Sequence, residues 1–245
     1  MNTHCLTILN LFPRLLSRNG EAGNLLALQK RCEWRGIDVE LVHFEPKSNP
    51  ALCEKADIIL GGGGLESGLA SLEPEVVRIA PQLHQLIDRG TPALFVCVSF
   101  QLMGTYVECS NGTRLEGAGI FSMHTLWEQE RKTGNIVTYN NNFGELIGYE
   151  NHHGKTILQK DQQPLGQIAS SHGYGNNGSD KTEGARYKNA LGTYLYGPLL
   201  PKNPQVADFL ISKALENRLG TSTELAPLPD TWLKQARAAA KARPR

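Results

Sequence analysis

The sequence predicts an α/β fold with a doubly wound, mostly parallel sheet, followed by a β-rich C-terminal half. Between residues 5 and 97, short apolar runs alternate with longer amphipathic segments. This is the pattern of parallel strands joined by crossover helices. After residue 116 the apolar runs become shorter, and Gly, Asn and His interrupt them. Such runs are typical of antiparallel strands.

The first half is expected to contain three strands and two helices before the central stretch. The strands are expected at residues 5–12, 37–44 and 56–60, and the helices at 25–35 and 74–89. The third strand leads directly into four glycines, Gly61 to Gly64. Because sites in such sheets form at the carboxyl ends of strands, the glycine run should lie beside the end of the next strand.

The stretch from Thr91 to Val107 is the centre of the chain. Its first half is a short apolar run that ends at Cys97, and residues from Phe100 to Tyr106 have the apolar spacing of one helix face. A nucleophile in the tight turn between a buried strand and a helix is the nucleophile-elbow arrangement. The helix N-terminus would lower the pKa of the thiol and offer backbone N–H groups to an oxyanion. A lone Cys in an apolar run is more often a small core residue.

Composition and charge exclude several classes of protein. The 245 residues are 40% hydrophobic and 20% charged, with a net charge of +1, so nothing indicates a nucleic-acid partner. The uncharged stretch from residue 90 to 107 contains Pro92, Gln101 and Gly104, and no membrane span is predicted. The five cysteines are scattered without C-x-x-C spacing, and no basic leader precedes the first strand. These features predict reduced thiols in a cytoplasmic protein.

The second half is expected to form a flap or an extension of the sheet. Strand-like runs lie at 134–140, 144–152, 155–160, 166–177 and 191–200. Asn203 and Pro204 are a suitable N-cap and first residue for a helix over 205–218. Residues 1–220 are therefore expected to form one domain. Residues 221–245 would form a linker and a basic, solvated helix that docks through Trp232 and Leu233; the alternative is a helix that contacts an acidic partner or the membrane surface.

Three polar features are candidates for the chemistry. A cysteine nucleophile needs a base, and His152 and His172 both lie in polar, loop-like segments, although a single His is more often a hydrogen-bonding residue. Arg131 could hold a substrate carboxylate or be a solvated charge. The glycine run lacks the Lys and Ser/Thr of a P-loop, so it either presents N–H groups to an oxyanion or is a flexible loop. No metal site is expected, because no carboxylate or Cys stands at ligand spacing from the adjacent histidines.

Several short motifs occur in order and together resemble one known family. They are GEAGN, RCEWRGI, ALFVC-x-x-FQ, RKTGNIV, GYENHHGKT, GYGNN, KTEGARYKN and GTYL-x-GPLLPKNP. On these motifs, over residues 5–218, the chain resembles the glutaminase subunit of lipid II isoglutaminyl synthase. That family is class I glutamine amidotransferase-like and is allied to the amidotransferase domain of cobyric acid synthase.

The resemblance implies a function and a partner. The family hydrolyses glutamine and passes ammonia to a Mur ligase-like subunit, with which it forms a heterodimer. The partner uses ATP and magnesium to amidate the D-glutamate of lipid II in peptidoglycan synthesis, so no cofactor is expected in this chain.

The resemblance also implies roles for particular residues. Cys97 matches the family's nucleophile, and Arg131 matches an arginine that binds glutamine. Gln101 closes the same motif as Cys97 and is expected to contribute to substrate binding. The backbone N–H groups of Val98 and Gly63 would form the oxyanion hole.

The chain departs from the family pattern at the catalytic centre. Tyr196 stands where the family has its catalytic His, and Val98 and Ser99 stand where it has two glycines. In the loop that the family writes as G-G-G-Q-D, Leu65 and Glu66 stand where the family has Gln and Asp. These departures predict a chain that keeps its fold and partner surface but has weakened or lost hydrolysis, so the alternative function is a non-catalytic subunit that binds and stabilises the ligase-like partner. Another histidine, such as His172, could instead serve as the base.

Overall fold

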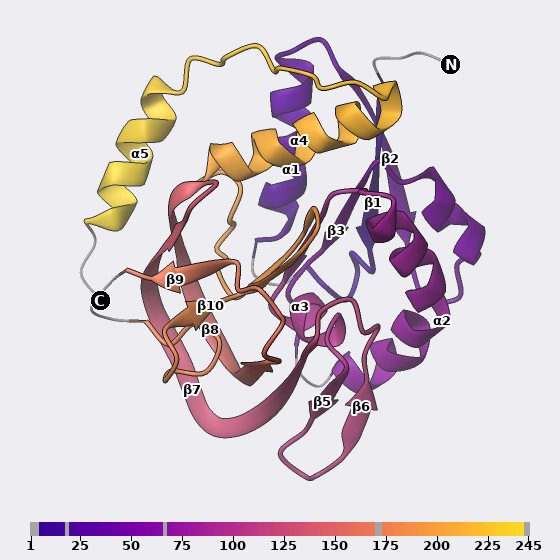
Figure 1. Cartoon of the computed structure of the whole chain (residues 1–245), viewed down its shortest axis with the longest axis vertical. Helices are drawn as coiled ribbons and strands as arrows, with labels where there is room; N and C mark the ends of the chain where they lie inside the picture. Colours follow the sequence, from indigo (N-terminus) through magenta and orange to yellow (C-terminus); the bar gives the residue numbers. More distant parts are fainter. Residues whose placement is uncertain (1–4, 18–19, 66–67, 170–172, 243–245) are drawn as a thin grey trace.

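The computed structural model describes residues 5–17, 20–65, 68–169 and 173–242, which form two six-stranded sheets with helices around them (Figure 1). The first sheet contains β1 (Cys5–Leu11), β2 (Asp38–Phe44), β3 (Ile58–Gly61), β4 (Ala93–Val96), β11 (Ala185–Tyr187) and β12 (Ala190–Thr193). Its strand order is β11-β12-β4-β3-β1-β2. The neighbours from β12 to β2 are parallel, and β11 pairs with β12 in the antiparallel direction. The predicted doubly wound, mostly parallel sheet is therefore confirmed.

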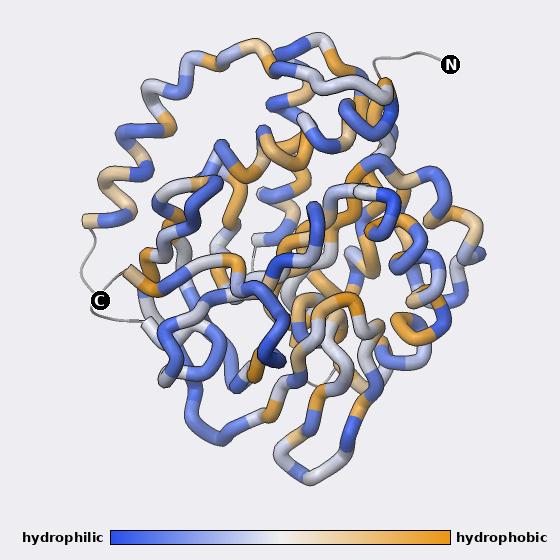
Figure 2. The backbone as a smooth tube through the Cα atoms, in the orientation of Figure 1, coloured by the Kyte–Doolittle hydropathy of each residue, from blue (hydrophilic) through white to orange (hydrophobic). Residues whose placement is uncertain are grey.

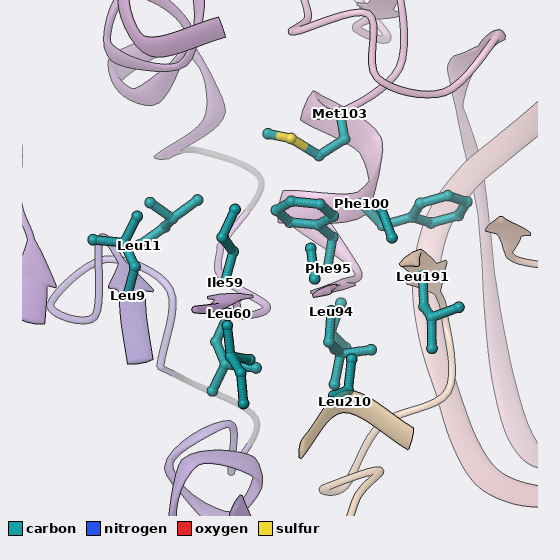
Figure 3. Packing of buried hydrophobic residues seen from close by; sticks show 14 of the residues in the cluster. Leu9, Leu11, Ile59, Leu60, Leu94, Phe95, Phe100, Met103, Leu191 and Leu210 are labelled. Atoms are coloured by element: carbon teal, nitrogen blue, oxygen red, sulfur yellow. The ribbon is translucent and has the colours of Figure 1, made fainter. Parts of the chain in front are cut away.

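Helices cover both faces of the first sheet. They are α1 (Ala22–Glu33), α2 (Leu69–Asp88), α3 (Val98–Leu102) and α4 (Pro204–Leu219), with a short 3₁₀ helix at Pro50–Lys55. Figure 3 shows Leu60 and Leu94 pointing towards Leu210 of α4. Phe95 points to the opposite face, on which Met103 lies beside α3. Strands buried on both faces read as continuous apolar runs, which is why the sequence pattern located β3 and β4.

The second sheet is built around one long hairpin. Its strands are β5 (Tyr106–Glu108), β6 (Arg114–Glu116), β7 (Met123–Asn140), β8 (Gly144–Leu158), β9 (Gly166–Ile168) and β10 (Thr182–Glu183). They are ordered β10-β9-β7-β5-β6, and β8 pairs with β7. The expected flap or extension is thus a separate sheet, in which the predicted short runs of 144–152 and 155–160 join into β8. Figure 2 shows that this sheet is more hydrophilic than the strands of the first sheet.

The predicted helix after Cys97 has different bounds for an identifiable physical reason. Helix α3 ends at Leu102, and the predicted continuation to Tyr106 is wrong because Tyr106 begins β5. The chain turns at Gly104, where an added Cβ would lie 2.9 Å from the carbonyl oxygen of Met123. The run 191–200 is expected to be a short strand that leads into a turn, and residues 190–193 pair with β4.

Helix α4 begins at the predicted position, but Asn203 does not cap it through its side chain. Its side chain makes no capping hydrogen bond. Instead, its Oδ1 accepts from the Ile147 N–H at 2.9 Å, and its Nδ2 donates to the Ile147 carbonyl at 2.8 Å. This residue therefore ties the start of α4 to strand β8.

The C-terminal helix α5 (Thr231–Lys241) lies at the edge of the molecule (Figure 1) and contacts the second sheet at Glu145 of β8. Trp232 is 80% exposed, so its expected part in docking the helix is wrong, whereas Leu233 is half-buried. Ion pairs hold the segment instead: Lys241 contacts Glu145, and Asp230 lies 2.9 Å from the buried Arg31 of α1. Among the described residues, no helix combines the length and apolar character that crossing a membrane would require.

Candidate active site at Cys97

Cys97 lies at the tip of β4, directly before α3. Its backbone has φ 54° and ψ −108°, a conformation that residues other than glycine rarely adopt. Its N–H donates to the Thr193 carbonyl at 2.9 Å, and its own carbonyl accepts from the Gln101 N–H at 3.0 Å. The predicted tight turn between strand and helix is therefore present, and hydrogen bonds on both sides hold it.

The two residues after Cys97 are built into this turn. The Ser99 hydroxyl accepts from the Val96 N–H at 2.9 Å and donates to the Val96 carbonyl at 3.0 Å. Val98 is the first residue of α3, and its N–H donates to no other residue that the structure describes. The turn forms with a β-branched residue at 98 because the positive φ falls on Cys97. A role of the Val98 N–H towards an oxyanion stays a prediction.

The glycine run is a packed wall of the site. An added Cβ on Gly62 would lie 2.1 Å from the Leu16 carbonyl oxygen and 2.6 Å from Cγ of Glu21. Gly62 and Gly63 are buried, and the Gly62 carbonyl accepts from the Ser99 N–H at 3.3 Å. Residues 61–63 are therefore no flexible loop. Their backbone lies beside the elbow, where the predicted oxyanion role of Gly63 would require it.

Tyr196 follows the end of β12, the strand next to β4, and is only 4% exposed. Its hydroxyl donates to the Asn151 carbonyl at 2.8 Å. Burial raises the pKa of Tyr196 above its ordinary value, and Cys97 raises the pKa further, whereas the charge of Arg131 lowers it. These influences keep its hydroxyl protonated at neutral pH.

Arg131 lies on an irregularity of the long hairpin. The pairing of β7 with β8 shifts register between Trp127 and Lys132, and such bulges re-aim side chains beside active sites. The exposed Arg131 donates from Nε to Oδ1 of Asn151. The buried Lys132 contacts Glu128 at 2.8 Å across the irregularity. The arginine is thus held by a specific hydrogen bond, although its binding of a substrate stays a prediction.

Gln101 belongs to a buried polar network behind α3. It is 1% exposed; its Nε2 donates to the Tyr194 hydroxyl at 3.2 Å, and its Oε1 accepts from Nε1 of Trp127 at 3.3 Å. The Tyr194 hydroxyl also lies 2.6 Å from the Thr156 hydroxyl. An added Cβ on Gly154 would lie 2.4 Å from the same oxygen. In this arrangement Gln101 supports the wall of the site, and its predicted contact with substrate stays a prediction.

The two histidines considered as alternative bases have different outcomes. His172 lies outside the described residues. His152 is 2% exposed and stacks on Tyr194 with ring centroids 3.7 Å apart. Its Nδ1 lies 3.0 Å from the Gly154 carbonyl, and its Nε2 lies 3.8 Å from Glu150. Burial lowers the pKa of His152, so the ring is neutral at physiological pH, and its role as a base stays a prediction.

Two residues of the site were missed in the sequence. Glu21 is buried against Gly62, and its charge raises the pKa of Tyr196. Asn151 accepts from both Tyr196 and Arg131. Both lie in motifs on which the resemblance rests, GEAGN and GYENHHGKT. The motifs therefore pointed to the right segments of the chain, but they gave no role to these two side chains. The described residues include no group of three or more His, Cys, Asp or Glu that could hold a metal ion.

A strained cysteine at the tip of a central parallel strand, with a glycine-lined wall beside it, is a nucleophile-elbow arrangement, and comparison with known proteins identifies the class as glutamine amidotransferase-like. A solved glutamine amidotransferase has the same fold, with a TM-score of 0.56 and 10% sequence identity. The alignment covers 84% of this chain and 98% of that chain. Residues 11–204 match the CobB/CobQ-like glutamine amidotransferase domain, and the chain belongs to this family.

Two relatives of this chain have the same function as each other and are similar to this chain over most of their length. Both are the glutamine-hydrolyzing lipid II isoglutaminyl synthase subunit GatD. The Staphylococcus aureus protein is 38% identical over 215 residues, which cover 88% of this chain and 86% of that protein. The Streptococcus pneumoniae protein is 32% identical over 231 residues, which cover 92% of this chain and 86% of that protein. The resemblance that the motifs indicated is thereby confirmed.

Proposed function

We propose that this chain is the glutamine amidotransferase subunit of a lipid II isoglutaminyl synthase. It would release ammonia from glutamine for a Mur ligase-like partner, which would use ATP and magnesium to amidate the D-glutamate of lipid II. The observation that carries the proposal is the 38% identity with the Staphylococcus aureus subunit over 88% of this chain. The strained turn at Cys97 supports it independently.

The arrangement fits acyl transfer from a glutamine side chain. The Cys97 thiolate would attack the amide carbon, and the N–H groups of Val98 and Gly63 would donate hydrogen bonds to the negatively charged oxygen. The C–N bond would then break, the nitrogen would leave as ammonia after taking up a proton, and a thioester would remain on the sulfur. Water would hydrolyse the thioester to glutamate and restore the thiol.

Tyr196 makes this cycle slow. The leaving nitrogen needs a proton donor that can also receive the thiol proton, and imidazole serves this purpose at neutral pH. A buried tyrosine that donates to the Asn151 carbonyl and has a raised pKa can do neither. The chain would therefore keep the fold and the partner surface of its family while its own hydrolysis is weak.

The test is ammonia release from glutamine by the purified chain, alone and with its Mur ligase-like partner. Release that depends on Cys97 in the complex supports the amidotransferase function. If the complex amidates lipid II with free ammonia but never with glutamine, the chain serves the ligase without hydrolysis. If the chain neither binds a Mur ligase-like protein nor releases ammonia, the proposal is wrong.

A further inference from the structure

Asn151 connects two predicted parts of the site through two different atoms. Its side-chain Oδ1 accepts from Nε of Arg131, and its backbone carbonyl accepts from the Tyr196 hydroxyl at 2.8 Å. In the ladder Asn151 pairs with Thr133, so its side chain reaches back along β7 to the irregularity. Its neighbour Glu150 is fully buried, and its carboxylate accepts hydrogen bonds from two backbone N–H groups of the segment before β10. The strand that carries Asn151 is therefore firmly held.

The contact through Nε leaves the other end of the guanidinium open. Within the part of the chain that the structure describes, Nε is the one nitrogen of Arg131 with a hydrogen-bond partner, and the residue is exposed. The two terminal amino groups form a fork that matches the two oxygens of a carboxylate. The amide oxygen of Asn151 carries no net charge, so it orients the guanidinium without neutralising it.

We propose that Asn151 is a positioning residue for glutamine, which holds Arg131 so that its terminal amino groups face the substrate α-carboxylate. This inference rests on the proposed function and extends it to a residue with no assigned role. Because the backbone carbonyl of Asn151 also holds Tyr196, one residue sets the spacing between the carboxylate clamp and the reaction centre at Cys97. A shift of about 1 Å in such spacing impairs catalysis strongly.

Glutamine affinity of the full chain, measured by isothermal titration calorimetry, tests this assignment. Asn151→Ala should weaken binding about tenfold, as expected for losing a hydrogen bond to a charged group. Asn151→Asp should weaken binding more, because its carboxylate would pair with Arg131 in place of the substrate. Asn141→Asp adds the same charge to the exposed turn between β7 and β8 and should leave the affinity unchanged.

A double-mutant cycle separates positioning from a general effect on the hairpin. If Asn151 acts through Arg131, then Asn151→Ala should cause no further loss in the Arg131→Ala background. An equal loss in both backgrounds would overturn the inference, and so would an unchanged affinity of Asn151→Ala in the otherwise native chain. If the native chain binds no glutamine at all, the proposed function itself fails, and the inference fails with it.

Discussion

The replacement Tyr196→His is the most direct test of why hydrolysis should be weak. Tyrosine has a reference pKa near 10, and burial raises the pKa of Tyr196 further. At pH 7 fewer than about one in a thousand of these hydroxyls is ionised. An imidazole at this position would be neutral and basic in a large fraction of molecules. Since general acid–base catalysis contributes about 10²- to 10⁴-fold, the replacement should raise cysteine-dependent hydrolysis about a hundredfold.

The same replacement should lower stability. Tyr196 would lose its hydrogen bond to the Asn151 carbonyl and an edge-to-face contact with Tyr149, whose ring centroid is 5.8 Å away. Together these contacts contribute about 1–3 kcal/mol. Activity and stability should therefore change in opposite directions, which separates restored chemistry from a general improvement of the fold.

The assay is ammonia release from glutamine by the chain with its partner. Adding Cys97→Ala to Tyr196→His should abolish the gain, and Tyr187→His on the partly exposed strand β11 should not reproduce it. If Tyr196→His leaves the rate unchanged, the oxyanion site is the limiting feature, and Val98→Gly is the next change to combine with it. Robust Cys97-dependent hydrolysis by the native chain would refute the reasoning, because another residue would then be the base.

Three further outcomes are expected. Iodoacetamide should label Cys97 in the native protein faster than Cys32, whose pKa burial raises to about 12; peptide mapping that finds equal rates would contradict the elbow assignment. The pKa of the fully buried Glu183 is raised from 4.5 to about 7 by burial, so the folded state holds a proton that the unfolded chain has released, and stability is lost as the pH rises through this range. Glu183→Gln removes this dependence. The free energy of unfolding in urea, measured for the variant minus the native chain, should therefore rise by about 3 kcal/mol from pH 4.5 to about pH 8. A difference that stays constant with pH would show that Glu183 does not titrate in this range. Truncation after Gly220 removes Asp230 from its ion pair with a buried arginine of α1, so the shortened chain should fold and melt a few degrees lower, for a loss of about 1–2 kcal/mol; failure to fold would show that residues 221–245 belong to the domain.

The parts of the fold that depend on local sequence could be predicted, and those that depend on distant contacts could not. The buried strands before Gly61 and Cys97 are continuous apolar runs, so their ends and the elbow followed from the sequence. The end of α3 depends on the approach of Gly104 to Met123, which no local pattern reveals. Likewise, the position of Arg131 depends on a register shift between two long strands. The sequence showed the residue type but not the partner that holds it.

The departures from the family pattern are consistent with a site that is kept in shape by new contacts. The Ser99 hydroxyl bonds to both backbone groups of Val96, and an added Cβ on Gly61 would lie 2.8 Å from Cβ of Ser99. Tyr196 likewise gains a hydrogen bond to Asn151. A glycine at 99 would lose both hydroxyl contacts, and a buried backbone group left without its partner costs about 1–3 kcal/mol. These residues therefore stabilise the walls around Cys97, so we expect the turn to keep its shape whether or not the chain hydrolyses glutamine.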